Sequence, residues 1–283
     1  MEFVVKNTHK NQSNILFFDT HGIEFFVEEF RYVENSKELK YIDTRRIKLM
    51  MDVFKNLIET TNLKYWNTEN VESFRACFSK CHDLEDFSGL SNWNTSKVQS
   101  TKCMFECCKM INTDFLKNWK FSENLLDVSY MFHGCLGLIS LEGLSNMDVS
   151  NVKSFKHMFS HCGSLKTLKG LEKWDVDKNA DFSYMFMYCW RLEDCSALDN
   201  WNLDKDHNRM FYGCDSIKIY PKWYHVEEIQ SDESQNVSQN VSQNVSINEP
   251  MMNIVIDIEE KYRDERRKMN NQELLKHSQK ETI

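Results

Sequence analysis

Cysteine is the residue type in this 283-residue chain whose chemistry could matter most, and the chain has ten of them. Evenly spaced thiols can form a disulfide ladder, ligate a soft metal such as zinc, or fill a core as small apolar groups. No Cys-x-x-Cys pair occurs, and the Cβ vectors of stacked repeats run side by side, so we expect core packing. Six cysteines recur at nearly constant spacing: Cys81, Cys108, Cys135, Cys162, Cys189 and Cys214.

Histidines are the next candidates. His157 and His161 stand four residues apart beside Cys162, and His133 lies one repeat earlier. This spacing suits a metal-binding helix, but on an exposed helical face such histidines are usually surface residues. An enzyme would need a pocket among His133, His157 and Asp127. Neither a nucleophile elbow nor a glycine-rich phosphate loop occurs, so we expect no catalysis, cofactor or metal.

All these residues belong to an internal repeat. Phenylalanine precedes each of the six cysteines by three residues, and the phenylalanines are spaced by 27 residues four times and then by 25. A fixed period in this range is typical of a solenoid. Residues 152–162 have helical apolar spacing, whereas 165–171 suit a short strand or turn. We therefore predict an α/β solenoid, a leucine-rich-repeat-like stack of about six units of 25–27 residues.

Three segments carry a family resemblance: 89–98 (GLSNWNTSKV), 128–135 (VSYMFHGC) and 148–159 (DVSNVKSFKHMF). They resemble the BspA-like leucine-rich repeats of mycoplasma and other bacterial surface proteins, also found in protists and large DNA viruses. The resemblance covers about 160 of the 283 residues. It implies a leucine-rich-repeat solenoid with a binding or adhesion role and without enzymatic activity. The segment before Trp66 looks like the N-terminal cap of that family.

The flanking segments suggest four further elements. Residues 1–43 predict a small β-hairpin element, in which 15–18 and 23–27 pair around a turn containing Gly22. Residues 44–62 predict an amphipathic capping helix, because apolar residues recur at helical spacing. The solenoid would span 63–225. Residues 226–250 are a polar, low-complexity linker, and 251–283 predict a charged, helical tail that could dock on a partner.

Composition limits the partners and the location. The formal net charge is −8 and the repeats lack a basic stripe, so nucleic-acid binding is disfavoured. No stretch reaches the roughly 20 apolar residues of a membrane span. The N-terminus lacks the apolar core of a signal peptide and a lipobox cysteine, unlike the surface proteins of the resembled family. We expect an intracellular protein, cytoplasmic or nuclear, in a host cell if the chain is a viral member of that family.

The variable positions between the fixed leucines are the candidates for partner contact. Their charge changes from acidic to neutral to basic and back, as a face for one protein partner would require. The partner's identity and the oligomeric state do not follow from the sequence. The alternative is a cysteine-based metal-binding or redox-responsive protein. The predicted contact residues are Glu85, Asp86, Asn112, Thr113, Ser140, Lys166, Thr167, Glu193 and Asp194.

Overall fold

The computed structural model describes residues 8–10, 16–18, 22–121, 123–203 and 209–224. The chain divides into two compact units, Met1–His225 and Val226–Ile283. The predicted linker (226–250) and tail (251–283) lie outside the described residues. No helix in the described ranges is long and apolar enough to cross a membrane. The strands are β1 (Thr8–Lys10), β2 (Leu16–Phe18), β3 (Phe25–Val27) and β4 (Leu49–Met51).

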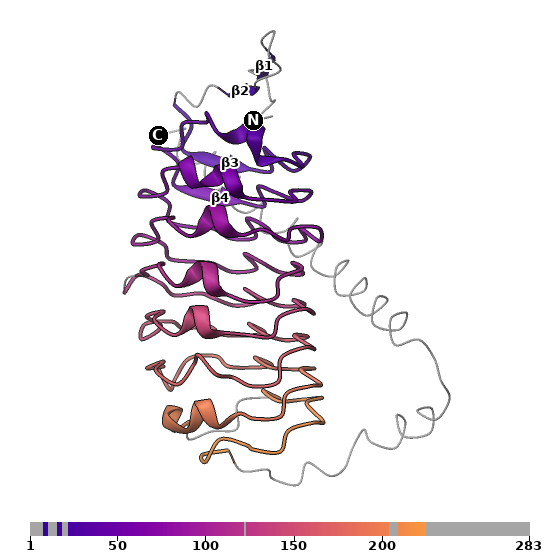
Figure 1. Ribbon diagram of the computed structural model, residues 1–283. Helices are drawn as coiled ribbons and strands as arrows, with labels where there is room; N and C mark the ends of the chain where they lie inside the picture. Colours follow the sequence, from indigo (N-terminus) through magenta and orange to yellow (C-terminus); the bar gives the residue numbers. More distant parts are fainter. Residues whose placement is uncertain (1–7, 11–15, 19–21, 122, 204–208, 225–283) are drawn as a thin grey trace, which may run out of the picture. The chain divides into compact units, whose positions relative to one another are not determined.

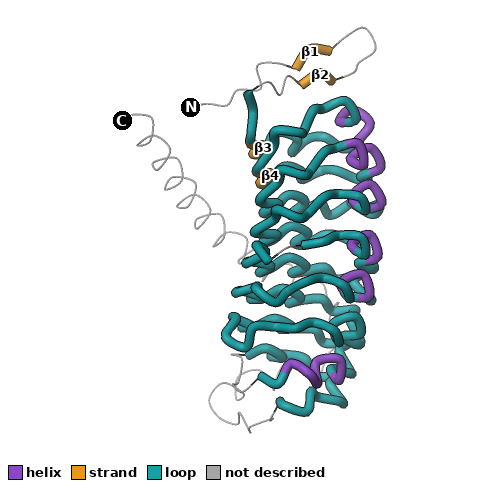
Figure 2. The backbone as a smooth tube through the Cα atoms, turned by 90° about the vertical axis from the view of Figure 1, so that its left-hand side faces the viewer, coloured by secondary structure: helices purple, strands orange, loops and turns teal. Residues whose placement is uncertain are grey.

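The helices of the described residues are short 3₁₀ turns. They are η1 (Ser36–Leu39), η2 (Thr61–Tyr65), η3 (Ser88–Leu90), η4 (Asp114–Leu116), η5 (Glu142–Leu144) and η6 (Ser196–Trp201). Figure 2 shows η1 to η5 on the same side of successive coils, so each of these marks the equivalent corner of its coil, and a coil without a helix precedes η6.

Residues 22–224, apart from the gaps given above, wind into coils that stack on one another (Figure 1). The coils are joined by parallel pairs of single residues. One such ladder runs through Leu49, Ser73, Ser100, Asp127, Ser154 and Asp181. Among the described residues of this stack, β3 and β4 form the only parallel pair longer than one residue. Phe25 pairs with Leu49 in its register. The fold therefore depends on stacked turns more than on strands.

A column of phenylalanines marks one coil after another. From Phe78 to Phe211, consecutive ring centroids are 5.5–5.8 Å apart. The column extends upstream, because Phe54 stacks on Phe78 at 5.1 Å and Phe30 on Phe54 at 6.0 Å. The described stack thus has eight phenylalanine-bearing coils, not the predicted six. The two additional coils escape a search at 27 residues because these first steps are 24 residues long.

The predicted capping helix at 44–62 is wrong. This segment contains β4 and turns, and β4 pairs with β3 in parallel as part of a coil. The apolar spacing of a coil resembles that of a helix, which explains the misassignment. The predicted hairpin is wrong as well, because β2 pairs antiparallel with β1, whereas β3 pairs with β4. Within 44–62, the apolar residues that suggested a helix fill the core of the coil. Those that are fully buried are Ile47, Met50, Val53, Phe54 and Leu57.

The helical prediction for 152–162 is also wrong. The segment is a run of turns in which two kinds of backbone hydrogen bond alternate. The N–H of Met158 donates to the Phe155 carbonyl within the turn at 3.0 Å, whereas the N–H of His157 donates to Ser183 of the next coil at 3.1 Å. Every second donor therefore joins two coils. Apolar residues three and four apart fit this arrangement as well as they fit a helix.

Two positions of the turns have a left-handed backbone, the first in all eight coils and the second in the last six. The first comprises Glu28, Asp52, Ala76, Cys103, Tyr130, His157, Tyr184 and Arg209, with φ from 53° to 67°. The second comprises Lys80, Cys107, Gly134, His161, Tyr188 and Gly213, with φ from 57° to 71°. A side chain at such φ costs about 1–2 kcal/mol, which glycine avoids. The fold tolerates this cost because the N–H groups at these positions donate hydrogen bonds to neighbouring coils.

The Lys80→Gly variant is expected to be more stable than Lys80→Ala by about 0.5–1 kcal/mol, since both remove the same side-chain contacts and only alanine keeps the strained Cβ. At Lys97, whose φ is not positive, the order should reverse, with alanine more stable than glycine. Urea unfolding of the four variants measures both differences. The same order at both sites would contradict a left-handed backbone at residue 80.

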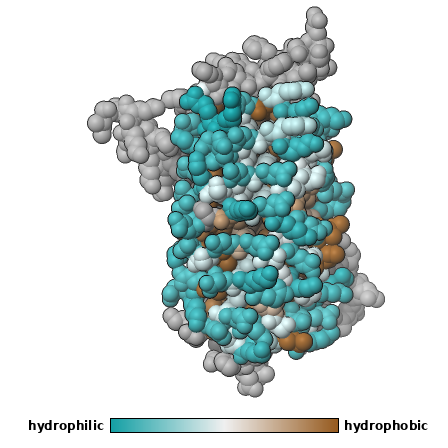
Figure 3. Space-filling view, turned by 60° about the vertical axis from the view of Figure 1, so that its left-hand side comes forward, coloured by the Kyte–Doolittle hydropathy of each residue, from teal (hydrophilic) through white to brown (hydrophobic). Residues whose placement is uncertain are grey.

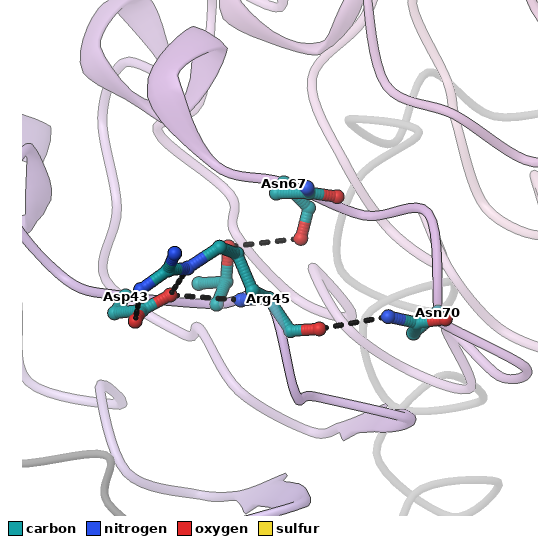
Figure 4. A network of polar contacts seen from close by, with 5 residues as sticks. Asp43, Arg45, Asn67 and Asn70 are labelled. Carbon is teal, nitrogen blue, oxygen red and sulfur yellow. Dashed lines mark hydrogen bonds and ion pairs between the residues drawn. The ribbon is translucent and has the colours of Figure 1, made fainter.

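Asparagine and aspartate shape another corner of the coils (Figure 4). The Asp43 carboxylate accepts the backbone N–H of Arg45 at 3.1 Å and also holds its guanidinium. The side chain of Asn70 then donates to the Arg45 carbonyl at 2.8 Å, linking two coils. The same side-chain-to-backbone turn forms at Asn67, Asn94 and Asp148. This turn explains why an asparagine or aspartate recurs there.

Candidate functional site

The cysteine ladder is part of the core. Each of the six thiols is at most 5% exposed, and none of the ten cysteines forms a disulfide. Burial raises the pKa of the Cys81 thiol to about 12 and that of Cys135 well above its ordinary value. Metal ligation and disulfide exchange both need the thiolate, which burial disfavours. The predicted core packing of these six residues is confirmed.

These thiols also donate weak hydrogen bonds. Cys108, Cys135, Cys162, Cys189 and Cys214 each donate S–H to the carbonyl of a phenylalanine one coil earlier, at 2.9–3.2 Å. A small apolar side chain with a donor at its tip fits this position, so the recurrence has a structural cause. Among the described residues, no group of three or more histidines, cysteines or carboxylates is arranged to hold a metal ion.

The three histidines form one cluster with Ser160. His133 Nδ1 lies 2.5 Å and His157 Nδ1 lies 3.2 Å from the Ser160 hydroxyl. The rings of His133 and His161 are 5.1 Å apart. His133 and His161 are only 4% and 5% exposed, so the expectation of surface histidines is wrong for both. Stacked turns, not an exposed helical face, carry these side chains.

Burial controls the charge of the cluster. It lowers the pKa of His157 and of His161 to about 4, with nearby Lys156 adding to the effect at His157. The pKa of His133 falls well below its ordinary value through burial and then through the neighbouring histidines and Lys80. All three rings are therefore neutral at pH 7.

The cluster is unsuited to nucleophilic catalysis in this form. Ser160 is completely buried, so its hydroxyl is closed to a substrate. The carboxylate of Asp127, the third residue of the hypothetical pocket, accepts the backbone N–H of Ser129 at 2.9 Å. His157 is sandwiched between Tyr130 and Tyr184, with ring centroids 4.7 and 4.8 Å away. The contacts of these residues are those of packed side chains.

The predicted contact residues lie mostly on one ladder of parallel pairs. Bridges join Glu59 to Asp86, Asn112 to Ser140 and Thr167 to Asp194. The positions just before them form a second, more exposed row along neighbouring coils. We call this row the ladder face: Ile58, Glu85, Ile111, Ile139, Lys166, Glu193 and Lys218.

Thr113 is the one predicted contact residue that is fully buried. Its hydroxyl accepts the N–H of Gly143 at 3.1 Å. The coil is one residue shorter after Cys108, so Met110 fills the core position that Leu84 and Leu138 occupy in the neighbouring coils. Ile111 is pushed to the surface and Thr113 into the interior. The prediction assumed a constant period across this shortening.

Two exposed isoleucines of the ladder face are not among the predicted contact residues. Ile111 is 62% and Ile139 is 55% exposed, and the N–H of Ile139 donates to the Ile111 carbonyl at 2.8 Å. Charged pairs flank them along the stack, formed by Glu85 with Lys109 and by Glu193 with Lys218. On the face drawn in Figure 3, hydrophobic residues lie scattered among hydrophilic ones. The shortened coil was the sequence signal that could have revealed Ile111.

Comparison with known proteins identifies a family for this repeat. No curated protein and no solved structure matches the chain. A family model matches residues 24–140 and 126–253, which together cover more than half of the sequence. The first match begins at the coil that contains β3, so it includes both upstream coils. The chain therefore belongs to the family described as "Mycoplasma protein of unknown function", DUF285.

Proposed function

We propose that this chain is a non-catalytic scaffold for protein–protein interaction, built as a BspA-like leucine-rich-repeat solenoid. The ladder face would contact the partner, with Ile111 and Ile139 at the centre. Their exposure on adjacent, hydrogen-bonded coils is the observation that carries the proposal. A partner that covers two large apolar side chains lying side by side in water would gain stability for the complex from their burial.

The residues around the two isoleucines have the polarity that is typical of the rim of a protein–protein interface. Stable interfaces have an apolar centre and a polar rim, and few central residues supply most of the binding energy. Here Glu85 and Lys109 lie on one side, and Lys166, Glu193 and Lys218 on the other. Backbone bonds between coils hold these side chains in place before binding, which lowers the entropic cost of association.

The rival function, a cysteine-based metal-binding or redox-responsive protein, gains no support from the ladder. Its thiols are buried and each of five donates to a backbone carbonyl. The thiol state of all ten cysteines supports an intracellular location, cytoplasmic or nuclear. A viral origin and action in a host cell rest on the family resemblance alone.

Binding by the ladder face is tested by capture of crosslinked partners on the full-length chain. The Ile111→Lys/Ile139→Lys variant should capture at least about tenfold less of any partner that binds the wild type, because two charges would enter the apolar centre. Leu126→Lys is the matched control, since Leu126 is 45% exposed on a different row of the coils.

A partner captured equally by wild type and the double variant would contradict the ladder face as the contact. A chain shortened to residues 1–224 separates this face from the predicted tail. Capture that survives the isoleucine changes and is lost with the shortened chain would assign binding to residues 225–283 instead. Circular dichroism of each variant verifies that the stack is retained.

A further inference from the structure

The charges of the ladder face follow a symmetrical order around its two central isoleucines. Glu85 lies on the coil before Ile111, and Lys166 lies on the coil after Ile139. The row is therefore acidic, apolar, apolar and basic over four successive coils. A row of this order is complementary to its own reverse, because turning it end over end places the basic position opposite the acidic one.

These four side chains are all exposed to solvent. Glu85 forms an ion pair with Lys109 of the next coil, and both partners of that pair are more than half exposed. An exposed ion pair contributes little to stability, so the Glu85 carboxylate can also accept a second cation. Every member of the row can therefore meet a surface that approaches the ladder face.

We propose that the ladder face binds a second copy of this chain, with the two stacks antiparallel and a two-fold axis between the coils of Ile111 and Ile139. This inference rests on the proposed function and names the protein partner. Ile111 of each copy would face Ile139 of the other, and Glu85 would face Lys166. Both contacts occur twice, because a two-fold interface uses the same surface of each chain.

The same charges disfavour a parallel arrangement of the two stacks. With the two-fold axis along the stack, each coil would face its own copy, so Glu85 would meet Glu85 and Lys166 would meet Lys166. Like charges brought together across an interface oppose binding. The antiparallel arrangement replaces both contacts with opposite charges and keeps the isoleucines together. The order of charges along the row therefore selects the antiparallel dimer.

The regular spacing of the coils extends this match beyond a single pair of coils. Consecutive ring centroids of the phenylalanine column are 5.5–5.8 Å apart over the last six coils, and Figure 1 shows the coils following one another along one direction. Two copies of one stack have the same spacing, so their coils stay opposite one another away from the axis. On the neighbouring ladder, Asn112 would face Ser140 and Asp86 would face Thr167, which brings no like charges together.

The complementary contact ends outside these four coils. On the next coils outward, Ile58 would face Glu193, and Glu59 would face the like charge of Asp194. Glu193 already forms an ion pair with Lys218 of its own chain. The contact is therefore limited to four coils of each copy, and a small interface of this kind is typical of reversible association.

Sedimentation of the full-length chain at increasing concentration tests the dimer. Glu85→Lys and Lys166→Glu should each weaken it at least about tenfold, because each variant places like charges opposite one another twice. These two changes shift the net charge in opposite directions, so a common loss cannot come from net charge. The double variant Glu85→Lys/Lys166→Glu should return to within about threefold of the wild type. The matched control is Lys173→Glu, the same charge change at an exposed residue of the same coil outside the ladder face.

A mixture of Glu85→Cys and Lys166→Cys chains tests the antiparallel alignment. Under mild oxidation the mixture should form a disulfide between positions 85 and 166 of different chains, which mass mapping identifies. The second Glu85–Lys166 contact of that mixed dimer stays intact. Either variant alone should form far less disulfide, because the two copies of one position would lie three coils apart.

A chain that stays monomeric at every concentration, or a double charge variant that dimerises no better than the single variants, would overturn the proposal. So would a disulfide that Glu85→Cys forms alone as readily as the mixture does. If the chain is monomeric and the Ile111→Lys/Ile139→Lys variant still loses capture of a different protein, self-association is wrong and the proposed function stands. A dimer that neither the charge variants nor the isoleucine variant weakens would contradict both.

Discussion

Replacing Gly143 with alanine is expected to lower the free energy of unfolding by about 3 kcal/mol or more. The new Cβ would lie 1.7 Å from the carbonyl oxygen of Thr113 and 2.2 Å from its carbon. That carbonyl belongs to the neighbouring coil and accepts the N–H of Leu116 at 2.9 Å, so it resists displacement. Two coils must separate to admit one methyl group. Urea unfolding of the full-length chain measures the loss.

Gly137 provides the matched control for this variant. Its Cβ would lie 3.2 Å from the Met110 carbonyl oxygen, a contact that a small shift relieves, so Gly137→Ala should cost less than about 1 kcal/mol. Gly89→Ala repeats the Gly143 test on another coil, because its Cβ would lie 1.8 Å from the Thr60 oxygen. Equal stability of all three variants would contradict the close approach of coils at this corner.

The repeating columns of the stack could be predicted from the sequence, and the local structure between them could not. The phenylalanine and cysteine columns are regular because a buried position in stacked coils keeps a constant size. The coils of Phe30 and Phe54 lack that cysteine and are three residues shorter, so they resembled a hairpin and a helix. Apolar spacing of three and four residues does not distinguish a helix from turns whose N–H groups alternate between partners.

The prediction of the candidate site was wrong where the repeat period changes and where the backbone is left-handed. One missing residue after Cys108 exchanges the roles of Ile111 and Thr113 between surface and core. The left-handed positions could not be recognised in the sequence, because residues other than glycine occupy most of them and glycine would have been the usual signal. For the same reason the sequence pointed to an exposed histidine pair at His157 and His161, not to a buried cluster.

Acidification from pH 7.5 to 5 is expected to destabilise the stack through its histidine cluster. Unfolded histidine titrates near pH 6.5, whereas the pKa of folded His157 and His161 is about 4. Between these values the unfolded chain binds protons that the folded chain does not, so stability is lost as the pH falls through this window. After allowance for partial exposure, each of these two rings should lower the free energy of unfolding by about 1–2 kcal/mol at pH 5.

Glu29 acts in the opposite direction. Burial raises its pKa from 4.5 to about 7, so this carboxyl favours the folded state as the pH falls from 7 toward 4.5. The Glu29→Gln variant should therefore lose more stability on acidification than the wild type does. Urea unfolding of the wild type and of this variant at several pH values separates the contribution of Glu29 from that of the histidines.

The histidine variants decide whether the cluster causes the acid sensitivity. His157→Gln and His161→Gln should each flatten the dependence of unfolding free energy on pH between 6.5 and 4, because glutamine has no proton to bind. His82 is exposed, and its ring nitrogen contacts the Cys107 carbonyl at 3.1 Å, so His82→Gln serves as the control and should leave the slope unchanged. An equal slope in all three variants would assign the sensitivity to carboxylates. The cluster would then bind protons equally in the folded and the unfolded chain, and its burial would not hold the rings neutral at pH 5.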